Sequence, residues 1–162
     1  MTALILALRE EHDNSDQVKR CLKECGHTIF AVDTFVKAKD LLKTESIDLI
    51  ISDVHLQNGG NVFDFLRWAK KAERTADIPF VLFSSQPTPM AKYLADGVRI
   101  SSRMLGAAKY IEMETFDAAE FQAQINELLA QKKQTTNIDR DWATETDADA
   151  DRDSEIVKKA GK

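Results

Sequence analysis

The feature that most constrains the fold is a short apolar run at residues 47–53, which reads Ile-Asp-Leu-Ile-Ile-Ser-Asp. A continuous apolar run of this length is typical of a strand buried on both faces, in the middle of a parallel sheet covered by helices. Ligands of open α/β sheets bind at the carboxyl ends of such strands. The run therefore predicts a ligand site at Asp53, although an aspartate that only caps a turn is an equally simple interpretation.

Four further segments have the composition of strands, and helical patterns separate them. These segments lie at residues 4–8, 28–32, 79–83 and 109–112. The helical patterns include capping residues at Thr34, Asn61 and Asp117. Because βαβ crossovers are right-handed, this alternation predicts an α/β fold. We expect a flavodoxin-like three-layer sandwich, with a five-stranded parallel sheet in the order 2-1-3-4-5 and helices on both faces.

Composition predicts one domain at residues 1–131 and a charged, flexible tail at 132–162. The net charge of −5 argues against a nucleic-acid surface, and no apolar run is long enough to span a membrane. The N-terminal run lacks the basic leader of a signal peptide. Cys21 and Cys25, four residues apart on one predicted helix, are interpreted as small core residues. We therefore expect a cytoplasmic protein.

Polar residues follow three of the predicted strands. Glu10 and Glu11 follow the first, Asp53 ends the third and Ser84 follows the fourth. The first and third strands are neighbours in the predicted order, so their carboxylates should converge and repel one another unless a cation lies between them. Oxygen ligands favour Mg²⁺, which would make Asp53 a workable nucleophile toward a phospho-donor. A hydroxyl at Ser84 could donate to a phosphoryl oxygen.

Residues 3–130 resemble the receiver domain of response regulators in two-component signalling. The resemblance is carried by the 47–53 strand, the 79–84 strand with its terminal hydroxyl, and the segment 106–111. It implies a phosphoacceptor that receives its phosphoryl group from a histidine kinase or a phosphotransfer protein and signals to a downstream protein. Beyond weak self-phosphorylation and self-dephosphorylation, it implies no enzymatic activity.

The resemblance also assigns roles to single residues. Asp53 accepts the phosphoryl group, Ser84 reorients toward it, and Tyr110 turns inward as the switch. Mg²⁺ is held by Asp53 and the early acids, and the residue matching His55 offers its backbone carbonyl to the metal. Considered by itself, Tyr110 is equally well explained as a half-buried aromatic of an edge strand.

Two departures from the family pattern affect the predicted site. The family has a Lys-Pro pair after the fifth strand, where this chain has Met113 and Glu114. Methionine cannot form the ion pair with a phosphoryl group, a loss of roughly 1.5–3 kcal/mol. Counting back from Gly26 places the family's two acids at Arg9 and Glu10, which makes Arg9 a candidate source of part of the missing positive charge.

The segment 87–105 is longer than the matching stretch of most receivers, and its predicted helix carries more apolar residues than one buried stripe needs. The extra residues either cover the edge of the sheet as core or form an interaction face. The second interpretation allows a homodimer through residues 90–112.

Two functions remain open from the sequence. The leading hypothesis is a stand-alone receiver that is phosphorylated at Asp53 in a Mg²⁺-dependent reaction and acts through protein contacts. The alternative is a pseudo-receiver, an interaction module without a working phosphoryl switch, and Met113 is its main support. A flavodoxin-like cofactor binder is disfavoured because the loop at residues 9–13 reads Arg-Glu-Glu-His-Asp, which repels phosphate.

Overall fold

The computed structural model describes residues 2–9, 15–54, 61–85 and 89–131. The chain divides into two compact units, Met1–Asn126 and Glu127–Lys162. The first unit holds the complete sheet, and residues 127–131 continue a helix. The predicted boundary between a domain at 1–131 and a tail at 132–162 stays a prediction, because the tail lies outside the described residues.

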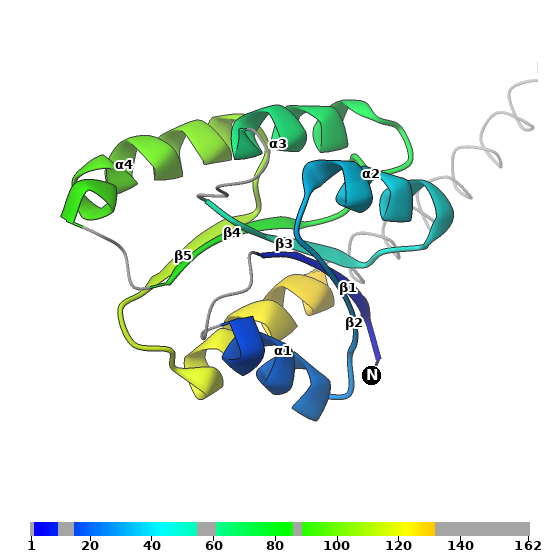
Figure 1. The fold of residues 1–162 in the computed structure, drawn as a ribbon, viewed down its shortest axis with the longest axis horizontal. Coiled ribbons are helices and arrows are strands. Elements are labelled where there is room, and N and C mark those ends of the chain that lie inside the picture. The colour runs from blue at the N-terminus through cyan, green and yellow to red at the C-terminus, as the bar shows by residue number, and fades with distance from the viewer. Residues whose placement is uncertain (1, 10–14, 55–60, 86–88, 132–162) are drawn as a thin grey trace, which may run out of the picture. The chain divides into compact units, whose positions relative to one another are not determined.

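The five strands of the first unit form one parallel sheet in the order β2-β1-β3-β4-β5. The predicted fold class and strand order are therefore confirmed, and the sheet runs through the middle of the unit (Figure 1). The strands are β1 (Leu4–Leu8), β2 (Thr28–Val32), β3 (Leu49–Asp53), β4 (Phe80–Ser85) and β5 (Lys109–Met113).

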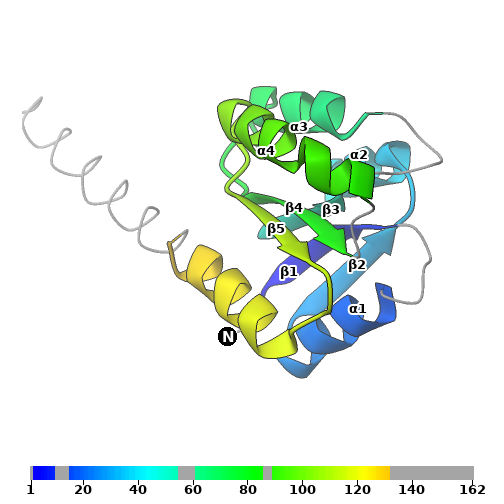
Figure 2. The ribbon, with the colours of Figure 1, turned by 90° about the vertical axis from the view of Figure 1, so that its left-hand side faces the viewer.

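Helices cover both faces of this sheet. One face carries α1 and the start of a helix at residues 118–131, and the other carries α2, α3 and α4 (Figures 1 and 2). Among the described residues, no helix combines the length and the apolar character needed to cross a membrane. The labelled helices are α1 (Ser15–Glu24), α2 (Phe35–Thr44), α3 (Val62–Lys71) and α4 (Pro89–Met104).

The helix starts follow the capping residues of the sequence. The Thr34 hydroxyl accepts a hydrogen bond from the backbone of Lys37 at 3.2 Å, and the Asn61 side chain accepts one from Phe63 at 2.8 Å. Each bond satisfies one of the free N–H groups of a first helical turn. Asp117 accepts a bond from Glu120 in the same way at the start of the last helix. All three predicted caps are confirmed.

Alternate residues of the buried strands fill two separate cores. On the side of α2 and α3, Leu6, Ile50 and Leu82 pack against apolar side chains of both helices. On the side of α1, the intervening residues of the same strands, such as Ile51 and Phe83, are equally buried. Every residue of β3 except Asp53 is fully buried, as expected for a central strand.

Asp48, just before β3, fixes the pairing of β3 with β1. Its backbone N–H donates to the carbonyl of Leu4 at 2.8 Å, and its carboxylate accepts from the backbone N–H of Leu4, also at 2.8 Å. The strands continue in this register, with Ile5 opposite Leu49. The same register, carried five residues onward from Leu4 and Asp48, places Arg9 opposite Asp53.

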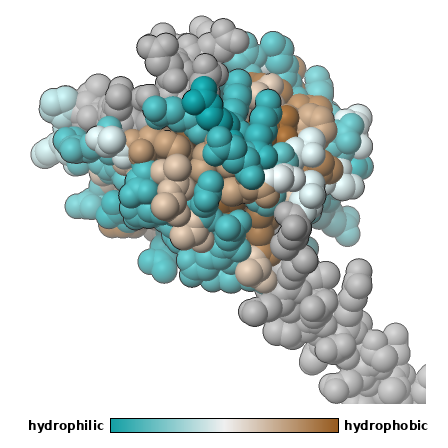
Figure 3. All heavy atoms as spheres, turned by 90° about the horizontal axis from the view of Figure 1, so that it is seen from below, coloured by the Kyte–Doolittle hydropathy of each residue, from teal (hydrophilic) through white to brown (hydrophobic). Residues whose placement is uncertain are grey.

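Helix α4 buries little of its apolar surface. Only Ala95 and Ser102 of this helix are fully buried, while Tyr93 and Met104 are 84% and 83% exposed. The interpretation of its extra apolar residues as core is therefore wrong for much of the helix. On the opposite side of the sheet, where α1 lies, hydrophilic residues surround scattered hydrophobic ones (Figure 3).

Candidate functional site

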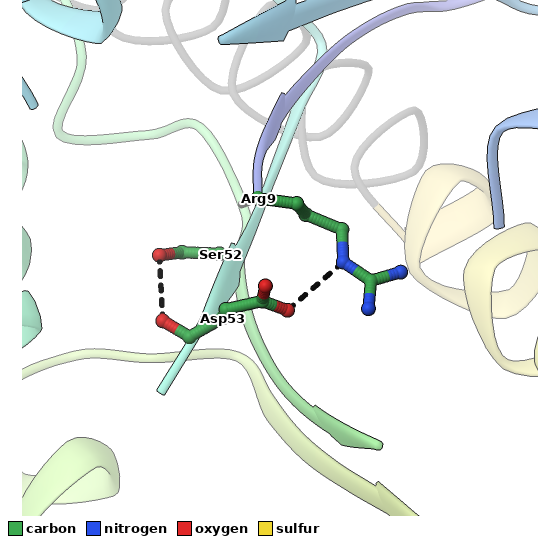
Figure 4. Close-up of polar contacts among 3 residues, drawn as sticks. All are labelled: Arg9, Ser52 and Asp53. Atoms are coloured by element: carbon green, nitrogen blue, oxygen red, sulfur yellow. Dashed lines mark hydrogen bonds and ion pairs between the residues drawn. The ribbon is translucent and has the colours of Figure 1, made fainter. Parts of the chain in front are cut away.

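The site centres on an ion pair between Arg9 and Asp53. Arg9 follows β1 directly and reaches across to the end of β3 (Figure 4). Its Nε donates to Oδ1 of Asp53 at 2.9 Å, and the two side chains are only 4% and 15% exposed. The Ser52 hydroxyl donates a hydrogen bond to the backbone carbonyl of Asp53 at 3.0 Å, at the same strand end. Asp53 therefore lies at the predicted edge of the sheet, but its carboxylate faces a cation that the chain itself supplies.

Aromatic side chains pack against this ion pair. Phe83 is the register partner of Asp53 on β4, and the Arg9 guanidinium carbon lies 4.9 Å from the centre of its ring. The centre of the Phe83 ring lies 5.5 Å from that of Phe121 and 6.5 Å from that of Phe116. A guanidinium over an aromatic face gains cation–π attraction, which is larger where water is excluded. Sequence reasoning did not single out Phe83; its place directly before Ser84 on a buried strand was the available signal.

Met113 and Ser84 lie on opposite faces of the sheet. Met113 ends β5 and shares its face with Ile111, the register partner of Phe83, so it lies on the Arg9–Asp53 side. It is 7% exposed, and its thioether brings no charge. Ser84 is one residue beyond the partner of Asp53, is also buried, and alternates to the face of α4. The positive charge on the side of Asp53 therefore comes from the first strand rather than from the fifth.

Tyr110 lies on the same face as Ser84 and is half-buried beside α4. The Arg99 guanidinium carbon lies 5.4 Å from the centre of its ring. Burial raises the pKa of the Tyr110 hydroxyl above its usual value, with the charge of Glu112 acting in the same direction. A hydrogen bond to the Ser84 side chain lowers this pKa and partly offsets the rise. The two predicted switch residues thus lie on the same face of the sheet, on the far side from Asp53.

The predicted magnesium ligands are only partly described. Glu10, Glu11 and His55 lie outside the described residues, so Asp53 is the one predicted ligand that the structure describes. Across the described ranges, no three metal-ligating side chains come together. A divalent cation at Asp53 would compete with the Arg9 guanidinium for the same carboxylate. The described residues thus include one of the four predicted ligands, and the Mg²⁺ site stays a prediction.

Glu114 pairs with α4 rather than with the ion pair at Asp53. Its carboxylate accepts a hydrogen bond from the ammonium of Lys92, and both side chains are exposed. This contact holds the pKa of the Glu114 carboxyl below its usual value. Glu114 and Lys92 thus connect the segment after β5 to the first turns of α4.

No family model matches this chain. A curated protein, the sensory transduction protein BceR of Halalkalibacterium halodurans, is 24% identical over 155 residues, which cover 94% of this chain. The match covers 61% of BceR, so this chain spans about three fifths of the length of that relative.

Solved structures of receiver domains share the fold. The receiver domain of NtrX from Brucella abortus superposes with a TM-score of 0.66 at 22% identity, covering 78% of this chain and 98% of that domain. The receiver domain of the sensor histidine kinase PA1611 from Pseudomonas aeruginosa, with magnesium in its active-site cleft, gives 0.66 at 17% identity and covers 80% and 99%. The resemblance inferred from the sequence is therefore confirmed for the fold: this chain folds as receiver domains of response regulators do.

Proposed function

We propose that this chain is a receiver module of two-component signalling that accepts a phosphoryl group on Asp53 and acts through protein contacts. The donor is a histidine kinase or a phosphotransfer protein. The observation that carries the proposal is the contact of 2.9 Å between Arg9 and Asp53 at the carboxyl end of a central strand. The pair combines an ionised carboxylate with a permanent cation at the edge of the sheet where ligands bind in this class of fold.

Arg9 has the chemistry that phosphoryl transfer requires. A carboxylate oxygen of Asp53 attacks phosphorus, the bond between phosphorus and the donor nitrogen breaks, and the phosphoryl charge comes to lie beside Arg9. The planar guanidinium binds phosphate oxygens in a fork and keeps its charge at every physiological pH. It lies over Phe83, where low water content strengthens electrostatic attraction. Arg9 thus supplies the charge that Met113 cannot.

Ser84 and Tyr110 would transmit the change to the face of α4. Phe83 and Ser84 are consecutive residues of β4 that lie on opposite faces, so a displacement of Arg9 and Phe83 moves the backbone that carries Ser84. Tyr110, on the same face of the neighbouring strand β5, is then positioned to respond.

A second candidate function is a pseudo-receiver that binds partners without phosphoryl transfer. The buried, uncharged Met113 on the side of Asp53 favours it, because the positive charge of the family's lysine is missing there. In that case the Arg9–Asp53 pair is a permanent structural contact, and partner binding does not depend on a phosphodonor.

Intact mass spectrometry after incubation with acetyl phosphate separates the two functions. The wild-type chain should gain one phosphoryl group and Asp53→Asn should gain none. Asp33→Asn is the matched control, because it removes an exposed carboxylate that follows β2 and should leave the gain intact. Arg9→Lys should retain more phosphorylation than Arg9→Met, since only the first keeps a cation.

The same experiment tests the predicted dependence on Mg²⁺. Reactions run with Mg²⁺ and with EDTA show whether the metal is needed, and Glu10→Gln, Glu11→Gln and His55→Ala test the predicted ligands. If the wild-type mass is unchanged under every condition, phosphoryl acceptance is excluded and the pseudo-receiver is the function that remains.

A further inference from the structure

A small cavity lies between the C-terminal half of α4 and the start of β5. Its volume is about 190 Å³; Arg99, Ser102 and Arg103 of α4 line one side, and residues 107–110 line the other. None of these lining residues is acidic. Sites for drug-sized ligands measure roughly 300–1,000 Å³, so this cavity fits a more compact ligand.

Two arginines give the cavity its charge. Arg99 and Arg103 are four residues apart on α4, a spacing that makes them neighbours on the helix surface and at which like charges repel. Nη1 of Arg99 lies 3.4 Å from the carboxylate of Asp96, but both side chains are exposed, and such a pair contributes little. No acidic side chain of the described residues forms an ion pair with Arg103. An anion between the two guanidiniums would relieve their repulsion.

Tyr110 holds one of these guanidiniums at the cavity. The guanidinium carbon of Arg99 lies 5.4 Å from the centre of the Tyr110 ring, and the ring itself is half-buried. A guanidinium over an aromatic face keeps its N–H groups, which point outward in its own plane, available to an anion. Because the ring already restrains Arg99, this side chain loses less conformational freedom on binding than an unrestrained arginine would.

The carbonyl groups at the end of α4 are already hydrogen-bonded. Free carbonyls at a helix C-terminus carry a partial negative charge that repels anions. Here the Ser102 carbonyl accepts from the N–H of Ala107 at 2.9 Å, and the Arg103 carbonyl accepts from that of Gly106 at 3.1 Å. Gly106 has a φ of 102°, which favours glycine at this helix end. The two guanidiniums therefore remain the dominant charges at the cavity.

We propose that this cavity binds a small phosphate monoester, whose phosphate group is held by Arg99 and Arg103. A phosphate monoester carries a charge of about −1.5 to −2 at pH 7, which matches two guanidiniums better than the single charge of a carboxylate does. The guanidinium fork also fits two phosphate oxygens at once. The organic part of the ester lies against the small side chains of Ala107 and Ala108. The site is separate from Asp53 and does not depend on its phosphorylation.

An NMR titration of the isotope-labelled full chain with glycerol phosphate tests the proposal. Backbone amide signals of residues 99–103 and 107–110 should shift and saturate. Arg99→Gln and Arg103→Gln should each weaken binding by about tenfold, because each removes charge-assisted hydrogen bonds to the phosphate. Arg67→Gln is the matched control, because Arg67 is also an exposed helical arginine with a carboxylate three residues before it, and it should titrate like the wild type.

Two further probes at equal ionic strength test the class of ligand. Acetate should bind more weakly than glycerol phosphate, because it carries one charge, and inorganic phosphate should bind more weakly because it lacks the organic part. Acetate or inorganic phosphate that binds as tightly as the ester would overturn the assignment to a phosphate monoester. The site itself is overturned if the wild type shows no saturable shifts at residues 99–110, if shifts are confined to residues 8–9 and 52–53, or if Arg103→Gln binds like the wild type. The amide spectrum of each variant shows that its fold is intact.

Discussion

The two faces of the sheet use the same kind of contact in different surroundings. On the side of α1, Arg9 lies over Phe83 at 4.9 Å and is almost fully buried. On the side of α4, Arg99 lies over Tyr110 at 5.4 Å, and its side chain is largely exposed. Asp53 pairs with a charge that is removed from water at the first arginine, whereas Asp96 and solvent balance the charge of the second. Loss of the Arg9 contact should therefore lower the free energy of unfolding more than loss of the Arg99 contact.

The largest expected effect comes from breaking the buried ion pair. Arg9→Ala should lower the free energy of unfolding by about 3 kcal/mol, because it removes a guanidinium that packs on Phe83 and pairs with Asp53. Arg99→Ala on the other face should cost much less, since that side chain is exposed. Urea denaturation of both variants measures the difference.

A double variant sharpens this test. Arg9→Met together with Asp53→Leu replaces both charges by apolar groups and should be more stable than Arg9→Met alone. If the double variant is the less stable of the two, the penalty does not come from a carboxylate that has lost its partner.

A pair of substitutions within β4 isolates the contribution of the cation. Phe80 and Phe83 are both fully buried on the same strand and contact other aromatic rings, but only Phe83 lies beneath a guanidinium. Phe83→Leu should therefore be more destabilising than Phe80→Leu by about 1 kcal/mol. Thermal unfolding of both variants checks this. Equal losses would show that Arg9 gains nothing from the ring.

The smallest expected effect is a pH dependence on the side of α4. Burial raises the pKa of Tyr110, so the native state keeps this proton at pH values where the unfolded chain releases it. The stability contribution is complete below about pH 10 and is lost as the pH rises through the native pKa. In Tyr93→Phe, Tyr110 is the only remaining tyrosine, and its ultraviolet titration should have a midpoint above about pH 10.

Tyr110→Phe provides the control for that titration. It should make unfolding less sensitive to pH above about 10, since the group responsible is gone. A tyrosine midpoint at or below the ordinary value would contradict the burial of Tyr110 beside α4.

The fold was accessible from the sequence because local signals agreed with one another. The apolar strands, the caps at Thr34 and Asn61, and the regular alternation of elements together favour one topology. The exposure of α4 was less accessible. Apolar residues at helical spacing predict a buried stripe, but they do not show whether one helix carries two such stripes and only one is covered.

The location of Asp53 at the end of a central strand was predicted, but its ion-pair partner was not. Asp53 lies at the expected strand end, whereas its observed partner is Arg9, which the sequence offered only as a candidate for the missing charge. Counting residues along one strand cannot reveal which side chain of a neighbouring strand will face it, because that depends on register. The roles assigned to Glu10, Glu11 and His55 stay predictions.

The two hydrogen bonds between Asp48 and Leu4 have a consequence for the register of the sheet. These bonds satisfy both the backbone N–H and the carbonyl of Leu4 where β1 and β3 begin, roughly 17 Å before Arg9 and Asp53 along the strands. A slip of one residue in this pairing would place Arg9 and Asp53 on opposite faces of the sheet. The register in which Asp48 pairs with Leu4 is therefore also the register that lets Arg9 and Asp53 meet at the other end of the same strands.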